Sequence, residues 1–224
     1  MQKLIVCLIV SISAVVAAFP FNRSWHESAT GVAGTNRAGG GGRYGTGGRT
    51  DKGIKCSHCH VKGAGKIGIN VTANPAFPTT NGDLKYVPGQ RYVITVQMTG
   101  EHRGGGGENP GPTNNKNGMA VAIEDGGGKR AGHFISDAGQ DSNACPAQNP
   151  YPGGTTPSPA GKTTFMYGDC HGVLSLDHQA LTQWTFTWDA HLTMFIGMVD
   201  GNTDGNSSLE DDTAERAMLL RTGP

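Results

Sequence analysis

Alternation of apolar and polar residues with a period of two is the main pattern along this chain. It is clearest in four segments: IGINVT (67–72), RYVITVQM (91–98), GMAVAIED (118–125) and WTFTW (184–188). This period is typical of β-strands that bury one face. A fifth segment, LTMFIGMV (192–199), is a continuous apolar run of the kind found in buried strands. We therefore expect at least five strands.

The segments between these strands are rich in glycine, proline and asparagine, as in GGGGENPGPTNNKNG before residue 118. Such residues favour turns, each through its own backbone preference. Short strands separated by turns predict an all-β protein with an antiparallel β-sandwich. Only the tail from Ser208 to Leu220 has a composition that suits a helical turn or two.

The N-terminus has the features of a secretory signal peptide over residues 1–18. Lys3 precedes an apolar run from Leu4 to about Val16, and two small residues, Ala17 and Ala18, follow. The run is too short for a membrane-spanning helix, which needs about 20 apolar residues. We therefore expect a secreted protein, extracellular or periplasmic, with no membrane span.

Domain limits follow from changes in composition. After the signal peptide, residues 19–52 lack a hydrophobic period and contain RAGGGGRYGTGG, which is close to a flexible linker. We expect a disordered Gly-rich N-terminal arm there, a β-sandwich domain over residues 53–215 and a C-terminal tail over 216–224. The formal net charge of zero argues against a nucleic-acid partner.

The segment CSHCH (56–60) is the strongest chemical signal. In a C-x-x-C-H motif two thiols can bind the vinyl groups of haem, and the adjacent histidine can bind its iron. This interpretation makes Cys56 and Cys59 the thioether residues and His60 the proximal iron ligand. A zinc site and a plain disulfide between the two cysteines remain open, although no second ligand pair of zinc spacing is present.

The residue in the sixth iron position does not follow from composition. Candidates are the remaining histidines and five methionines: His26, His102, His133, His171, His178, His191, Met98, Met119, Met166, Met194 and Met198. We expect Met119, Met194 and Met198 to fill the core, because they lie in predicted strands.

Two further features have structural interpretations. Cys145 and Cys170 bound a Pro/Gly-rich segment, and in an oxidising compartment we expect them to form a disulfide, worth roughly 3–4 kcal/mol. Ligation of a metal by Cys170 and His171 is the alternative. Residues 200–211, DGNTDGNSSLED, match a calcium loop at several positions, but the flanks are not helical, so we interpret them as a polar turn.

The order of these features resembles a known family. CSHCH, then YVPGQRYVITVQMTG (86–100), GMAVAIEDGGGKRAGHF (118–134), a histidine before WTFTWDA (184–190) and FIGMVDGNTDGNSS (195–208) resemble the Reeler-like, choice-of-anchor V domains of secreted bacterial proteins. The resemblance covers roughly residues 56–212. It differs at GMA in the third strand, at Ala190-His191 after the tryptophan strand and in the extra segment between Cys145 and Cys170.

The resemblance implies a fold and a function. The fold is an immunoglobulin-like β-sandwich, and the function is that of a monohaem c-type cytochrome carrying one covalent haem c. It makes His178 the distal iron ligand, ahead of His133 and His171. Two histidine ligands leave no open iron position, so we expect single-electron transfer rather than catalysis, with redox proteins or an extracellular acceptor as partners and self-association as an option. The alternative is a non-enzymatic binding or structural module in which CSHCH is a disulfide or zinc clip.

Overall fold

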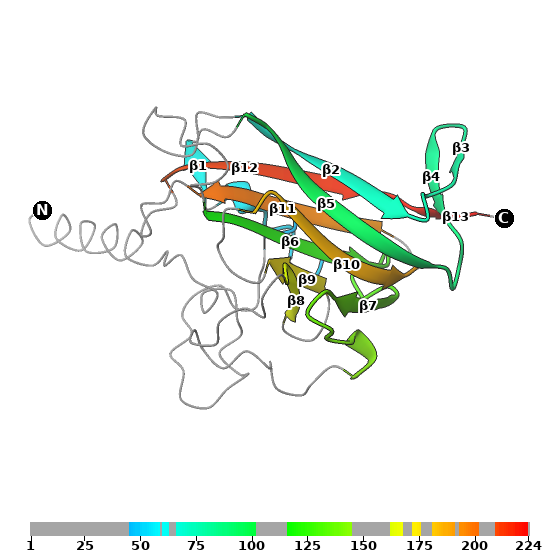
Figure 1. The fold of residues 1–224 in the computed structure, drawn as a ribbon. Helices are drawn as coiled ribbons and strands as arrows, with labels where there is room; N and C mark the ends of the chain where they lie inside the picture. The colour runs from blue at the N-terminus through cyan, green and yellow to red at the C-terminus, as the bar shows by residue number, and fades with distance from the viewer. Residues whose placement is uncertain are drawn as a thin grey trace, which may run out of the picture.

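Strands dominate the computed structural model, which describes residues 45–58, 60–62, 66–101, 116–144, 162–167, 172–175, 181–190, 193–201 and 209–223 (Figure 1). In chain order the elements are η1 (Cys56–His58), β1 (Val61–Lys62), β2 (Lys66–Asn74), β3 (Thr79–Thr80), β4 (Asp83–Tyr86), β5 (Arg91–Glu101), β6 (Lys116–Glu124), β7 (His133–Ser136), η2 (Ser142–Ala144), β8 (Thr164–Tyr167), β9 (Gly172–Ser175), β10 (Gln183–Asp189), β11 (Thr193–Gly201), β12 (Leu209–Met218) and β13 (Arg221–Thr222).

Two sheets form the body of the protein. One has the order β1-β12-β11-β6-β9-β8, and the other has the order β2-β5-β10-β7. Figure 1 shows them as two layers, with β5 and β10 crossing over β11 and β6. Within these two sheets every strand pair is antiparallel except β1 with β12. The all-β antiparallel sandwich expected from the sequence is therefore confirmed.

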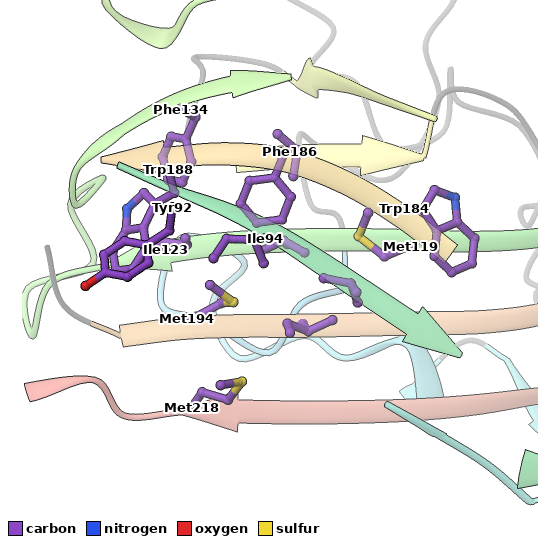
Figure 2. Close-up of a cluster of buried hydrophobic side chains, with 14 of the residues drawn as sticks. Tyr92, Ile94, Met119, Ile123, Phe134, Trp184, Phe186, Trp188, Met194 and Met218 are labelled. Atoms are coloured by element: carbon purple, nitrogen blue, oxygen red, sulfur yellow. The ribbon is translucent and has the colours of Figure 1, made fainter. Parts of the chain in front are cut away.

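The core lies between the sheets, and the period-two pattern explains its composition. Along β10, Trp184, Phe186 and Trp188 point into the core and are at most 1% exposed. Figure 2 shows these rings facing Met119, Ile123 and Met194 of the opposite sheet. All five methionines considered as iron ligands are core residues: Met98, Met119, Met166, Met194 and Met198. Burying such a side chain contributes about 1.5–3 kcal/mol, which accounts for their presence there.

The expected helical turn near the C-terminus is wrong. Leu209–Met218 forms β12, which pairs antiparallel with β11 along its length. The sequence LEDDTAERAM contains good helix formers, but helix propensity is a weak preference that tertiary pairing overrides. β12 thus covers the edge of β11 that lies opposite β6.

Two segments outside the predicted limits of the sandwich domain, residues 53–215, pack against the sandwich. Met218 and Leu220 belong to the hydrophobic core, and β13 pairs with β4 in a small sheet of order β13-β4-β3. At the other end of the chain, residues 45–55 form turns closed by a bridge between Thr46 and Lys55. The described sandwich thus begins before residue 53 and continues beyond residue 215.

The segment 45–58 covers part of the outer face of the six-stranded sheet. Small residues on that face leave room for it: Ala120 of β6 stands beside Gly197 of β11 in the strand register, and both are buried. A Cβ at position 197 would lie 2.5 Å from the carbonyl oxygen of Gly45. The absence of a side chain there lets the segment lie directly on the sheet.

Candidate functional site

The CSHCH segment begins as a single helical turn. The His58 amide donates to the Lys55 carbonyl at 3.1 Å, and the His60 amide donates to the Cys56 carbonyl at 2.9 Å. In a helical turn, residues three and four apart share one side. Cys56 and His60 are thus linked across one turn, and Cys59 lies outside the described residues.

Cys56 is buried in a pocket bordered by two glycines. Its thiol donates a weak hydrogen bond to the Gly45 carbonyl at 3.4 Å, and the residue is 9% exposed. A Cβ at Gly197 would lie 2.8 Å from the Cys56 sulfur, and one at Gly45 would lie 3.1 Å from it. Gly45 also has a positive φ of 78°, which side chains other than glycine rarely adopt. We call Gly45 and Gly197 the glycine cradle.

Contacts with distant strands hold the turn in place. The Ser57 amide donates to Glu215 Oε1 of β12 at 2.9 Å. The Lys55 amide donates to Nδ1 of His58, an exposed side chain, at 3.2 Å. His60 is half-buried, and the chain then continues into β1 alongside Leu209 of β12. The motif is thus fixed to the edge of the six-stranded sheet before the first long strand begins.

Two buried carboxylates anchor the segment that precedes the motif. Glu124 of β6 is fully buried and accepts hydrogen bonds from the amides of Arg49 and Thr50 at 2.8 and 2.9 Å. Asp51, also buried, accepts from both the amide and the hydroxyl of Thr46. Buried charges are tolerated when they are hydrogen-bonded in this way. Sequence analysis did not identify either residue, since a single acidic residue in a strand or a glycine-rich stretch gives no signal.

His133 has a different role from the one considered for it. In β7, on the four-stranded sheet, its Nδ1 lies 2.9 Å from Asp189 Oδ2 and its Nε2 lies 2.6 Å from Asp141 Oδ1. Asp189 in turn accepts two hydrogen bonds from Arg91, at 2.9 and 3.1 Å. Because both ring nitrogens contact carboxylates, His133 has none left for an iron atom.

These contacts change the titration of the three groups. Burial lowers the pKa of His133, but its hydrogen bonds with Asp189 and Asp141 outweigh burial and raise that pKa overall. The hydrogen bond from Arg91, and less strongly that with His133, lowers the pKa of Asp189. The Asn143 amide and His133 lower the pKa of Asp141. These shifts favour the charged imidazolium between two carboxylates, in agreement with the two ring-nitrogen contacts.

The other predicted site residues lie outside the described part of the chain. They are Cys59, His171, His178 and the expected disulfide partners Cys145 and Cys170. In the sequence, His178 falls between the end of β9 and the start of β10. Its assignment as distal ligand and the Cys145–Cys170 disulfide stay predictions.

No metal cluster is found within the described ranges, where no three His, Cys, Asp or Glu side chains are placed to hold an ion. The possible calcium loop at 200–211 begins at the end of β11 and finishes in β12, and residues 202–208 are not described. Strands rather than helices therefore flank it, unlike an EF-hand. A membrane-spanning helix is likewise absent from the residues that the structure describes.

Comparisons with known proteins give a fold likeness only. No family model matches the chain, and no curated protein matches it. Among solved structures it is similar to the reeler domain of human F-spondin, fragment 1, with 10% identity and a TM-score of 0.36 over 68% of this chain and 88% of that one. Fragment 2 gives 13% identity and a TM-score of 0.34 over 69% and 92%. The Reelin-N domain of F-spondin gives 13% and 0.35 over 74% and 95%. At these TM-scores the likeness assigns no function, and the fold rests on the strand order given above.

Proposed function

We propose that this protein is a monohaem c-type cytochrome that transfers single electrons outside the cytoplasm. The observation that supports the proposal is the turn that begins at Cys56, which the glycine cradle and Glu215 hold against the sheet. Covalent haem attachment uses two thiols and an imidazole, and the residues of the CSHCH motif supply that donor set.

The residues have distinct roles in this proposal. Cys56 and Cys59 hold the haem as thioethers, His60 binds the iron from the proximal side, and His178 binds it from the distal side. The assignment of His178 is supported by the resemblance to choice-of-anchor V domains. The haem, when bound, supplies a reversible one-electron couple.

The surroundings of the turn suit electron transfer. His60 is half-buried and leads into β1 at the edge of the six-stranded sheet, so the group it binds would lie near the protein surface. A net charge of zero gives little electrostatic steering toward one partner. Redox proteins or an extracellular electron acceptor are therefore the expected partners.

A second candidate is a non-enzymatic structural module in which CSHCH is a disulfide or zinc clip. The burial of the Cys56 sulfur between Gly45 and Gly197 favours it, because an enclosed sulfur fastens the segment 45–58 to β11. In this case the purified protein would be colourless even from a host able to attach haem.

Two histidine variants test the first proposal. With the protein produced in a host that attaches c-type haem, His60→Ala is expected to abolish the low-spin visible spectrum. His58→Ala is the matched control. The His58 side chain is exposed, and its Nδ1 accepts a hydrogen bond from the Lys55 amide. Equal spectra for the two variants would reject His60 as the proximal ligand. A low-spin spectrum that survives His178→Ala would reject the distal assignment alone.

A further inference from the structure

The outer face of the four-stranded sheet carries a regular array of uncharged polar side chains. We call it the hydroxyl–amide face, and it consists of the outward residues of three adjacent strands, β2, β5 and β10: Asn70, Thr72, Asn74, Val93, Thr95, Gln97, Thr99, Gln183, Thr185 and Thr187. The residues between them in the chain, such as Ile94, Val96 and Phe186, point into the core. Each of these strands thus has one face in the core of the sandwich and one face in the array.

The strand register arranges these side chains in rows. Thr72, Thr95 and Thr185 stand side by side across three strands. The next row consists of Asn70, Gln97 and Gln183. Neighbouring strands are spaced by roughly 4.8 Å, so each row presents hydroxyl or amide groups at that interval. One row thus offers three hydroxyls and the next offers three amides.

Charged residues stand beyond the two ends of the array, and the carboxylate of Asp137 lies at its side. It accepts hydrogen bonds from Thr163 and Thr164, which contact the backbone of Thr185. At one end Lys66 stands opposite Glu101 in the register, and at the other Arg91, Asp189 and His133 form one row across β5, β10 and β7. Asp189 is hydrogen-bonded to both Arg91 and His133. Val93, 45% exposed, is an apolar side chain of the hydroxyl–amide face, and Ile135 of β7 stands next to Thr187 in the register.

The two outer faces of the sandwich differ in what lies on them. The segment 45–58 packs on the six-stranded sheet, through the glycine cradle and Glu124. On the four-stranded sheet, the amide side chains of Asn70, Gln97 and Gln183 are exposed. The side chains of Thr95 and Thr185, in the next row, are partly exposed. Hydrogen-bonding groups of both kinds are therefore presented to solvent in a fixed arrangement.

We propose that the hydroxyl–amide face binds a neutral polysaccharide. A nucleic acid or an anionic lipid surface would require Lys or Arg, and a protein interface is normally centred on aromatic residues or arginine. A neutral polyhydroxylated polymer requires what this face offers, namely donors and acceptors without charge. The chain's overall neutrality and its predicted signal peptide agree with a partner of this kind outside the cell.

The physical arrangement also lowers the cost of binding. Threonine is β-branched and restricted at χ1, so little side-chain entropy is lost when it is held by a ligand. Each hydrogen bond contributes only about 0.5–1.5 kcal/mol net, so a single sugar would bind weakly. A polymer that contacts several rows at once gains by effective concentration, so we expect binding to insoluble polymer rather than to free sugars.

The test is depletion of the full-length protein from solution by insoluble cellulose and chitin, with alginate gel as the acidic polymer for comparison. The wild type is expected to bind at least one neutral polymer and not alginate. Thr95→Glu places one charge in the central row and is expected to weaken that binding at least tenfold. The triple variant Thr72→Val, Thr95→Val, Thr185→Val removes the row of hydroxyls but keeps β-branched shape, and the same loss is expected.

Thr213→Val in β12 of the other sheet is the matched control and should bind as the wild type does. The melting temperature of each variant shows whether the sandwich is intact. A wild type that binds neither neutral polymer, or a Thr95→Glu protein that binds as well as the wild type, overturns the proposal. So does a dimer in sedimentation that Thr95→Glu dissociates, since a second copy would then occupy the face. None of these results depends on haem.

Discussion

The ring of His133 in β7 is bonded to the carboxylate of Asp189 in the neighbouring strand β10, with Nδ1 and Oδ2 2.9 Å apart. Asp141, which follows β7 in the chain, contacts the other ring nitrogen at 2.6 Å. Arg91 of β5 donates a hydrogen bond to Oδ1 of Asp189. One imidazole thus joins an edge strand, a central strand and the turn after β7. Both contacts are hydrogen bonds only while the ring carries both protons.

The free energy of unfolding should therefore depend on pH through His133. The pKa of this group in the folded protein is raised above its ordinary value of 6.5, so its stabilisation is full below that value and is lost as pH rises through the raised pKa. His133→Gln can donate to only one carboxylate, and we expect it to cost about 1 kcal/mol at about pH 5.5 and clearly less at about pH 8.5. Urea unfolding of both proteins at the two pH values measures the difference.

At low pH the free energy of unfolding should depend on pH in the opposite direction, through Asp189. The lowered pKa of Asp189 contributes stability above its ordinary value of 3.8, which is lost as pH falls through the lowered pKa. The contact is thus fully stabilising between the two ordinary values, and it is lost only below the lowered pKa of Asp189 or above the raised pKa of His133. A gap between wild type and His133→Gln that grows from about pH 5.5 to about pH 8.5 would contradict the assignment of charge.

Gly197→Ala should disturb the glycine cradle. The added methyl group would lie 2.5 Å from the Gly45 carbonyl oxygen and 2.8 Å from the Cys56 sulfur, so the segment 45–58 must move away from β11. Overpacking of this kind costs about 1–3 kcal/mol. We expect a lower melting temperature and faster tryptic cleavage after Lys52 and Lys55. Gly126→Ala is the control, because a methyl group there meets no atom within 4 Å; equal effects of the two substitutions would argue against the cradle.

Two buried tryptophans of β10 should respond differently to replacement by phenylalanine. Trp188 Nε1 donates to the Ala131 carbonyl at 3.1 Å, whereas Trp184 Nε1 is buried and finds no acceptor within the described part of the chain. Trp188→Phe removes a hydrogen bond and leaves the carbonyl of Ala131 without that donor. Trp184→Phe instead removes an unsatisfied donor. We expect Trp188→Phe to be the more destabilising by about 1–2 kcal/mol in chemical denaturation. Equal losses would mean that Trp184 has a partner.

The fold was predictable from sequence wherever one face of a strand is buried. Trp184, Phe186 and Trp188 all lie in the core, as their spacing predicts, because side chains alternate across a strand. The same rule fails for β12, where only Met218 among the side chains described is buried. Its position depends on the hydrogen-bonding edge of β11, which is a property of the tertiary structure.

The candidate site was predictable only in its local part. CSHCH is a contiguous motif, and its chemistry can be inferred from five residues. Its supports are distant in the chain: Glu215 lies 158 residues from Ser57, and Glu124 lies 75 residues from Arg49. A single glycine or glutamate gives no sequence signal of the segment that folds against it, so the cradle and the buried anchor appear only in the structure.

The most direct test of the central claim is a pyridine haemochrome spectrum of the mature wild-type protein, made in a host that attaches c-type haem and then extracted with acid acetone. The proposed function predicts a c-type spectrum that remains with the protein after extraction, and an intact mass increased by one haem. Loss of both in Cys56→Ser/Cys59→Ser would assign the attachment to the CSHCH turn. A colourless wild type of unmodified mass, made beside a control cytochrome that is fully loaded, would contradict the haem assignment and leave the turn as a structural clip.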